Sequence, residues 1–148
     1  MPPEEAVSLH VFGVRISIIV PATATGGAFS LFEETTPPRV GPPLHIHHGE
    51  EEFFRIVEGH YRFRVGEEEI DAEPGHTLLV PRGTLHTFFN MSEESGRLFM
   101  GFSPGGAETF FVQVAAQNLV VPADMGQIGA LGLEHNLEFV GSNPFLDS

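Results

Sequence analysis

A short polar stretch, residues 42–59, carries side chains of the types that bind metal ions. Its sequence is PPLHIHHGEEEFFRIVEG, and it places three histidines next to three glutamates: His45, His47 and His48, followed by Glu50, Glu51 and Glu52. Imidazole nitrogens and carboxylate oxygens are common protein ligands of divalent transition metals. Because the chain has no cysteine, disulfide bonds and thiolate metal sites are excluded. A polar turn between two strands would have the same composition, so the six candidates must be separated by other means.

Alternation along the predicted strands separates them. Successive side chains of a strand point to opposite faces, so His45 and His47 share one face and His48 takes the other, where it is exposed or supports the site from outside. In the next strand Arg55 is costly to bury, which places the odd-numbered positions outside and Glu52 inside. The other two glutamates are expected to form a solvated rim at the turn. A single histidine in a strand is usually an ordinary residue, but the H-x-H pair with a carboxylate five residues later favours a metal site.

A fourth candidate ligand lies downstream, in the segment LHTFFN. His86 shares a strand face with Phe88, so it enters the same interior as Glu52 if the Phe88 face points inward. The same alternation predicts inward-facing side chains that would line a substrate pocket over the metal: Phe54, Ile56, Tyr61, Phe63 and Phe88. Because side chains fill most of a small barrel, most of the 14 phenylalanines are expected in the core, and the remainder in an apolar pocket for a flat or aromatic ligand.

The segments that must position these residues have the pattern of short strands. Glycines and prolines separate runs rich in valine, isoleucine, phenylalanine and threonine. Strands are predicted at 14–20, 28–36, 44–48, 52–59, 60–66, 68–73, 76–81, 85–90 and 97–103, and short helices at 107–117 and 123–136. Many short strands with frequent turn signals favour an all-β sandwich or barrel, here with one or two short C-terminal helices.

The overall composition limits partners and location. A length of 148 residues is typical of one domain. The formal net charge of −13, from 20 acidic and 7 basic residues, argues against binding to nucleic acid or to anionic membrane surfaces. The N-terminal MPPEEAVSLH has no basic segment followed by an apolar run, and no apolar stretch approaches the roughly 20 residues that span a bilayer. We therefore expect a cytoplasmic protein, and its partner is the small-molecule ligand of the predicted apolar pocket.

Two motifs together resemble those of the cupin superfamily. The first reads H-x-H-x4-E-x6-G over residues 45–59, and the second reads G-x5-P-x-G-x2-H-x3-N over residues 75–90. The second matches the cupin pattern at every position. The first departs from it only in the leading glycine, because the expected position holds Arg39 and the nearest glycine is Gly41. The 15 residues between the motifs, 60–74, are similar to the spacing in compact microbial cupins with a single domain.

The resemblance implies a fold and a metal site. The fold would be a single cupin barrel, a double-stranded β-helix or jelly roll, over about residues 7–103, with a helical C-terminal extension over about 104–148 in one domain, 1–148. One divalent transition-metal ion (Fe, Mn, Ni, Co, Cu or Zn) would have four protein ligands: His45, His47, Glu52 and His86. Four protein ligands leave one or two positions of such an ion open, as a catalytic site requires.

The C-terminal segment SPGGAETFF…LGLEHNLEFVGSNPF and the PPLHIHH stretch resemble cupins described as quercetin-2,3-dioxygenase-like. This implies a metal-dependent dioxygenase that acts on a small flavonol, enol or aromatic substrate, with Glu52 as the catalytic proton acceptor. The alternative is a metal-containing binding or sensing module without turnover. A sugar-phosphate isomerase or epimerase is disfavoured, because it needs cations that bind phosphate, and Arg55, Arg62 and Arg64 fall on outward faces.

Apolar residues on the predicted outer face indicate self-association. Phe53 and Val57 share the outward face of their strand with Arg55, and the N-terminal strand 14–20 (VRISIIV) is apolar along most of its length. Cupins commonly pair through their sheets, and a second copy would cover these side chains. We therefore expect a homodimer.

Overall fold

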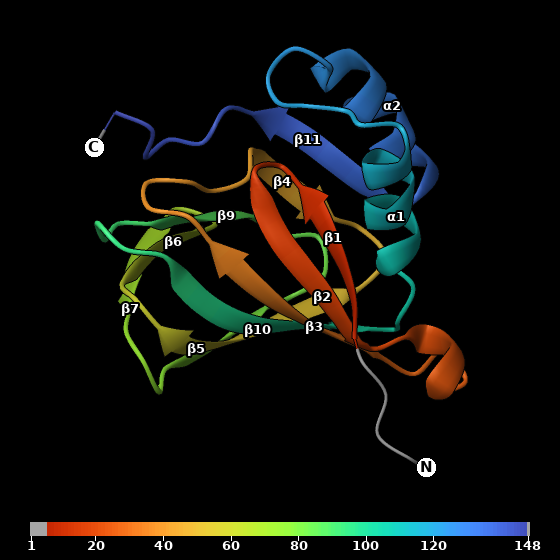
Figure 1. The fold of residues 1–148 in the computed structure, drawn as a ribbon, viewed down its shortest axis with the longest axis horizontal. Coiled ribbons are helices and arrows are strands. Elements are labelled where there is room, and N and C mark those ends of the chain that lie inside the picture. The colour runs from red at the N-terminus through yellow and green to blue at the C-terminus, as the bar shows by residue number, and fades with distance from the viewer. Residues whose placement is uncertain (1–5, 148) are drawn as a thin grey trace.

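The computed structural model describes residues 6–147, which form two antiparallel β-sheets that face each other, with two helices along one side (Figure 1). One sheet has six strands in the order β1-β2-β3-β10-β5-β8, and the other has five in the order β11-β4-β9-β6-β7. Neighbours in sequence such as β4 and β5 lie in opposite sheets, so the chain winds repeatedly across the barrel. The predicted all-β barrel is confirmed.

The elements have the following bounds. The strands are β1 Val7–Val11, β2 Val14–Val20, β3 Ser30–Thr36, β4 Leu44–His47, β5 Glu51–Glu58, β6 Tyr61–Val65, β7 Glu68–Ala72, β8 Thr77–Val80, β9 Leu85–Asn90, β10 Gly96–Ser103 and β11 Leu137–Gly141. The helices are α1 Glu108–Ala116 and α2 Met125–Glu134, and a short 3-10 helix covers Ala22–Ala24. All nine predicted strands and both predicted helices are present, with ends shifted by at most two residues. β1 and β11 were not predicted.

The alternation that selected the candidate ligands is visible in β5. Glu52, Phe54 and Ile56 are buried, while Phe53 and Arg55 are exposed on the outer face. Arg55 donates a hydrogen bond to the carbonyl oxygen of Gly75 at the surface, 2.8 Å away. The charge on the outward arginine therefore fixes which face of the strand meets the core, because a buried guanidinium without an ion partner would be costly.

Aromatic rings fill the space between the sheets below the candidate site. The ring centroids of Phe54 and Phe63 are 4.9 Å apart, and Phe88 lies 5.4 Å from Phe63 in an adjacent position across β6 and β9. Tyr61 and Ile56 are buried in the same core cluster. All five side chains therefore point inward, as strand alternation predicted.

The C-terminal extension completes the barrel wall. α1 packs against β1 and α2 packs against β11, and β11 pairs with β4 at the edge of the five-stranded sheet. This pairing places Leu137 opposite His47 and Phe139 opposite His45. The residues after β11 fold back onto the barrel, where the Asn143 amide donates hydrogen bonds to the backbone carbonyl oxygens of Pro42 and Phe88. The extension thus contributes a strand beside the candidate ligands.

Close backbone approach explains the glycine near the first motif. A Cβ atom on Gly41 would collide with the carbonyl oxygen of Phe88 and with the amide of Asn143. Any larger residue would therefore push the segment that leads into β4 away from β9. Gly41 has this packing role two positions after the place where the family pattern expects a glycine.

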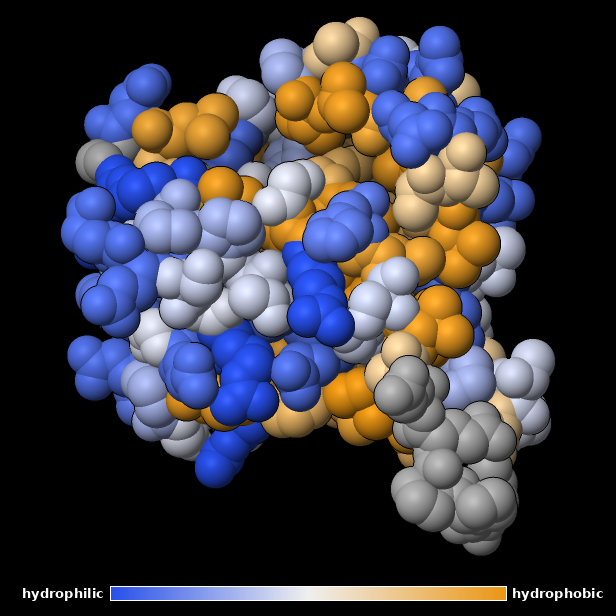
Figure 2. Space-filling view, in the orientation of Figure 1, coloured by the Kyte–Doolittle hydropathy of each residue, from blue (hydrophilic) through white to orange (hydrophobic). Residues whose placement is uncertain are grey.

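The surface is divided by hydropathy. In Figure 2 apolar residues gather on the half that carries the helices and the N-terminal strands, whereas polar residues dominate the opposite half, over β5, β6 and β7. Among residues 6–147, no helix has the length and apolar character needed to cross a bilayer. Residues 1–5, part of the N-terminal stretch MPPEEAVSLH considered above, lie outside the described residues.

Candidate metal centre

Four buried side chains converge between the sheets. His45 and His47 come from β4, Glu52 from β5 and His86 from β9, and one ligand atom from each lies within 4.8 Å of all the others. His45 and His86 are directly opposite each other across the β4–β9 ladder. Glu52 Oε1 lies 2.8 Å from His86 Nε2 and 3.5 Å from His47 Nε2. The structure therefore brings together the four residues predicted as ligands; their metal binding stays a prediction.

Each imidazole is held by a hydrogen bond at Nδ1. His45 Nδ1 donates to the carbonyl oxygen of Pro43 at 2.8 Å, and His86 Nδ1 donates to the carbonyl oxygen of Thr84 at 2.9 Å. A carbonyl oxygen can only accept, so in both rings the hydrogen is on Nδ1 and the lone pair of the neutral ring is on Nε2. These partners fix the ring orientations before any ion binds, as outer partners of metal ligands do.

A glutamate supports the third ring. His47 Nδ1 lies 2.7 Å from Glu50 Oε1, and both side chains are largely buried. Glu50 was predicted to lie in a solvated rim, but the turn after β4 brings its carboxylate back to His47 instead. The i,i+3 spacing of the two residues is the only signal in the sequence for this contact. An ionised carboxylate that accepts from Nδ1 makes the ring a stronger ligand.

Electrostatics keep the cluster receptive to a cation. Burial, followed by repulsion from His86 and His47, lowers the pKa of His45 well below its ordinary value. His45 is therefore neutral at physiological pH, which is the form that binds metal. Glu52 Oε1 and the Nε2 lone pair of a neutral His86 face each other at 2.8 Å, and two acceptors at that distance need a proton or a cation between them.

The donor set consequently fits a divalent transition-metal ion. Three imidazole nitrogens, which are borderline donors, and one hard carboxylate oxygen are buried and mutually close, and such a mixed set suits these ions. The rings are oriented by their own hydrogen bonds, so the site needs little rearrangement on binding. The same donor set suits several metals, and it leaves the identity of the ion open.

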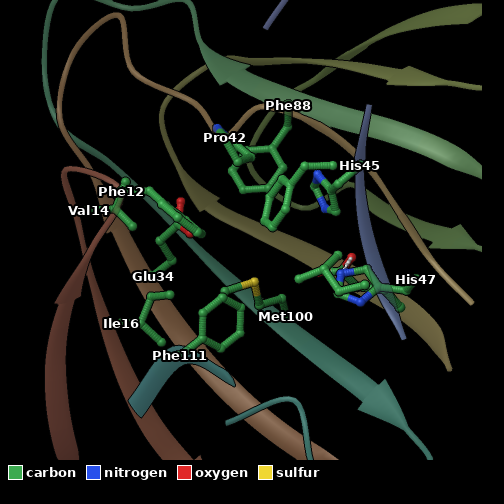
Figure 3. Close-up of a pocket in the computed structure, with 13 residues that line it drawn as sticks. Phe12, Val14, Ile16, Glu34, Pro42, His45, His47, Phe88, Met100 and Phe111 are labelled. Carbon is green, nitrogen blue, oxygen red and sulfur yellow. Dashed lines mark ion pairs between the residues drawn. The ribbon is translucent and has the colours of Figure 1, made fainter. Parts of the chain in front are cut away.

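A narrow apolar cavity opens onto the cluster (Figure 3). It encloses about 480 Å³ between atoms, with its open mouth included. The residues that line it come from β2–β5, β9–β11, α1 and adjoining loops: Phe12, Val14, Ile16, Glu34, Pro42, His45, His47, Glu52, Phe88, Met100, Phe111, Leu137 and Phe139. Of the five predicted pocket residues, Phe88 is among them, while the other four lie in the packed core. Alternation gives the direction of a side chain and says nothing about its depth in the barrel.

The remaining charged residues of the opening stretch point away. His48 is exposed and lies 2.9 Å from Glu138 on β11. Glu51 is partly exposed and accepts two hydrogen bonds from the guanidinium of Arg82, at 2.7 and 3.2 Å. Arg82 holds the pKa of the Glu51 carboxyl below its usual range. Neither residue reaches the cluster, as strand alternation predicted.

Sequence comparison identifies the region around the cluster. The model of the Cupin_2 family, described as a cupin domain, matches residues 32–102, a range that includes all four cluster residues. No curated protein matches the chain.

Several solved structures have the same fold. The Cnp3 cupin domain of Schizosaccharomyces pombe is similar over 70% of this chain and 68% of its own, with 17% identity and a TM-score of 0.60. A predicted oxalate decarboxylase from Thermotoga maritima is similar over 68% and 94%, with 18% identity and a TM-score of 0.63. The polyketide cyclase RemF from Streptomyces resistomycificus is similar over 70% and 79%, with 18% identity and a TM-score of 0.61. At these identities the similarity concerns the fold alone.

Proposed function

The chain contains a single cupin domain, and from that premise we propose that it is a metal-dependent dioxygenase, similar to quercetinases, acting on a small flavonol, enol or aromatic substrate. The observation that carries the proposal is the buried cluster of His45, His47, Glu52 and His86, which opens directly into a mostly apolar cavity. A purely structural metal site would be closed by a full set of protein ligands without such an opening.

The cluster would hold the ion and the cavity would hold the substrate. A divalent ion bound there would lower the pKa of a substrate hydroxyl and so favour its anionic form. Glu52 lies beside that position and would accept the hydroxyl proton. Phe88, Met100 and Phe111 would contact the flat body of the substrate and exclude water during the insertion of both atoms of dioxygen.

The charge distribution supports this substrate class over phosphorylated sugars. The chain has no lysine, and none of its seven arginines lines the cavity. Arg62 pairs with Asp71 at 3.0 Å on the outside of the barrel, and Arg55 is also exposed. A phosphate group in the cavity would therefore lack a cationic side chain among the described residues.

Metal content is the first test. Protein purified without chelators is expected to contain about one transition-metal ion per chain, because four ligands are already in place. A protein that stays empty after loading with Fe, Mn, Ni, Co, Cu and Zn in turn would rule out the proposed site.

Oxygen uptake is the second test. Each metal form would be tested for oxygen consumption with flavonols, other enols and catechols, and uptake that depends on both metal and substrate is expected. A Glu52→Gln variant, which keeps an oxygen donor but is a poor base, should bind substrate and consume oxygen far more slowly. Ligand binding without oxygen uptake in any metal form would favour the binding-module alternative.

Self-association is part of the same proposal. Phe53 and Leu79 face each other across β5 and β8 on the outside of the six-stranded sheet, with 39% and 62% of their surface exposed. The ring of Phe53 lies over the buried Gly101 of the next strand. A second copy would cover both exposed side chains. Sedimentation should show a dimer at micromolar concentration and a monomer for Phe53→Lys; a wild-type monomer would contradict the proposal.

The acidic composition bears on location and on other partners. A net charge of −13 makes binding to nucleic acid or to anionic lipid unfavourable. Cytoplasmic location and the absence of a nucleic-acid partner stay predictions from the sequence.

A further inference from the structure

A carboxylate lies in the cavity on the side away from the cluster. Glu34 is only 3% exposed, and in Figure 3 it projects from β3 into the cavity across from His45 and His47. Its neighbours in the strand register are Ile16 on β2 and Leu98 on β10, both buried and apolar. A carboxylate in an apolar row is costly to bury, so its place there needs a reason.

The protein supplies only part of the hydrogen bonding of Glu34. The Thr36 hydroxyl donates to Glu34 Oε2 at 2.6 Å. Among the described residues, Oε1 accepts no hydrogen bond and no arginine or histidine forms an ion pair with this carboxylate. Oε1 is not among the fully buried unpaired side-chain atoms of the described residues, so it faces the open space of the cavity. The free Oε1 is therefore available to a hydrogen-bond donor that enters the cavity.

Buried hydroxyls hold this carboxylate in position. The Tyr61 hydroxyl donates to Thr36 Oγ1 at 2.8 Å, and Thr36 in turn donates to Glu34. A charged carboxylate can only accept, so with Glu34 ionised the chain runs from Tyr61 through Thr36 and ends on Glu34. Tyr61 is fully buried, which makes the chain a rigid support. The arrangement orients Oε2 toward the protein and leaves the other oxygen for a ligand.

We propose that Glu34 accepts a hydrogen bond from a second hydroxyl group of the substrate, so that the cavity selects flat molecules with an ionisable oxygen at one end and a hydroxyl at the other. The inference rests on the proposed function and deepens it, because the first oxygen belongs at the cluster. Between the two polar ends the cavity is lined by apolar side chains such as Met100 and Phe111, which match an aromatic body.

A hydroxyl fits this end better than an ammonium group. Burial raises the pKa of the Glu34 carboxyl to about 7, the Thr36 hydrogen bond lowers it, and the negative charge of Glu52 across the cavity raises it. Near neutral pH the group therefore exchanges between its neutral and charged forms, and both can pair with a hydroxyl. An ammonium ion would pair only with the charged form and would have to leave water for an apolar wall.

Ligand pairs that differ by one hydroxyl test the inference. The probes are kojic acid and allomaltol, which differ by a hydroxymethyl in place of a methyl, and flavonol with its monohydroxylated derivatives on either outer ring. Dissociation constants are measured by calorimetry or fluorescence without oxygen, on zinc-loaded and on metal-free protein. In at least one pair the hydroxylated member should bind wild type at least about tenfold more tightly than the member without the hydroxyl. A hydrogen bond to a charged group contributes a free energy of that size.

Variants assign that preference to Glu34. Glu34→Leu should bind both members of a pair equally, and Glu34→Gln, which keeps an acceptor oxygen without the charge, should show a smaller preference than wild type. Met100→Leu reshapes the same cavity and should change both affinities alike. Glu33→Gln removes the neighbouring charge on the outer face of β3 and should leave the preference unchanged. A preference that survives in Glu34→Leu, or a wild type without preference in any pair, overturns the inference.

Different results would contradict the dioxygenase activity and the role of Glu34. Glu34 forms no hydrogen bond or ion pair with a cluster residue, so the hydroxyl preference should persist in metal-free protein. A persistent preference with no oxygen uptake in any metal form would support the role of Glu34 and contradict the dioxygenase. Oxygen uptake with equal rates and affinities for all pairs would support the dioxygenase and contradict the role of Glu34. Failure of every probe to bind either form would contradict both.

Discussion

The two polar ends of the cavity differ in how much of their hydrogen bonding the protein itself provides. At the cluster end the three imidazoles each have a partner at Nδ1: a backbone carbonyl for His45 and His86, and the Glu50 carboxylate for His47. At the opposite end Glu34 has a single hydroxyl partner and an oxygen that accepts from no described residue. The cluster end is therefore the fixed end, because each of its rings has a hydrogen-bond partner behind it. At the Glu34 end only one of the two carboxylate oxygens has a protein partner.

This difference separates two ways of preparing a site. The cluster has its outer hydrogen bonds in place, so an ion would meet ligands that are already oriented, and little reorganisation would weaken its binding. Glu34 instead carries an unrelieved desolvation cost, which a ligand hydroxyl would reduce. The first arrangement favours permanent occupancy by a cofactor, and the second favours a group that enters and leaves with each substrate.

The largest predicted effect concerns the fixed end. His47→Ala removes one of four ligands and should reduce metal content from about one ion per chain to an undetectable level, because even loss of an outer partner typically costs about 10–100-fold in affinity. Elemental analysis after dialysis against trace metal would measure it. His48→Ala is the matched control, since its ring points to the outside and pairs with Glu138. Full metal content in His47→Ala would show that the four residues are not the site.

The second predicted effect tests how much the burial of Glu34 lowers the free energy of unfolding. Its pKa is raised from 4.5 to about 7 in the folded protein, so between these values only the folded form keeps the proton. The contribution of Glu34 to stability is therefore fully present below about pH 4.5 and is lost as pH rises through about 7. At pH 8, metal-free Glu34→Gln should be more stable than wild type by up to about 3 kcal/mol.

Chemical denaturation at several pH values would measure this gap. The advantage of Glu34→Gln should shrink toward pH 5, where the wild-type carboxyl is protonated in the folded state. Glu33→Gln, on the outer face of the same strand, should show no such pH dependence. A variant less stable than wild type at pH 8 would mean that Glu34 stabilises the fold, and the contrast between the two ends would disappear.

Much of the fixed end was predictable from the sequence, because strand alternation is a local property. His45, His47 and Glu52 follow from the two-residue period, with Arg55 marking the outer face. The cupin motif supplied His86, which is distant in sequence and adjacent in space. The barrel itself was predictable from glycine and proline spacing, since turn chemistry is also local.

Which other side chains line the cavity depends on strand pairing and sheet packing, which alternation within one strand does not encode. In SLFEETT one of two adjacent glutamates must face inward, but only the pairing of β3 with β2 and β10 decides that it is Glu34. Similarly, Leu137 and Phe139 reach the cavity because β11 pairs with β4 from about 90 residues away. Phe54 and Phe63 point inward as predicted, yet the packing of both sheets places them below the cavity.

The smallest predicted effect tests the support of the fixed end itself. Glu50→Ala deletes the acceptor for His47 Nδ1 and should weaken metal affinity by about 10–100-fold, while the ion still binds at saturation. Glu50→Gln keeps an acceptor oxygen without its charge. Because charge-assisted hydrogen bonds are roughly twice as strong as neutral ones, this variant should lose an intermediate amount of metal affinity. Glu51→Ala removes the adjacent carboxylate, which pairs with Arg82 on the surface, and should leave the affinity unchanged. Competition with a chelator would measure all three. Equal losses for Glu50→Ala and Glu51→Ala would mean that only the net negative charge matters, whereas an effect confined to Glu50 would mean that ring orientation does.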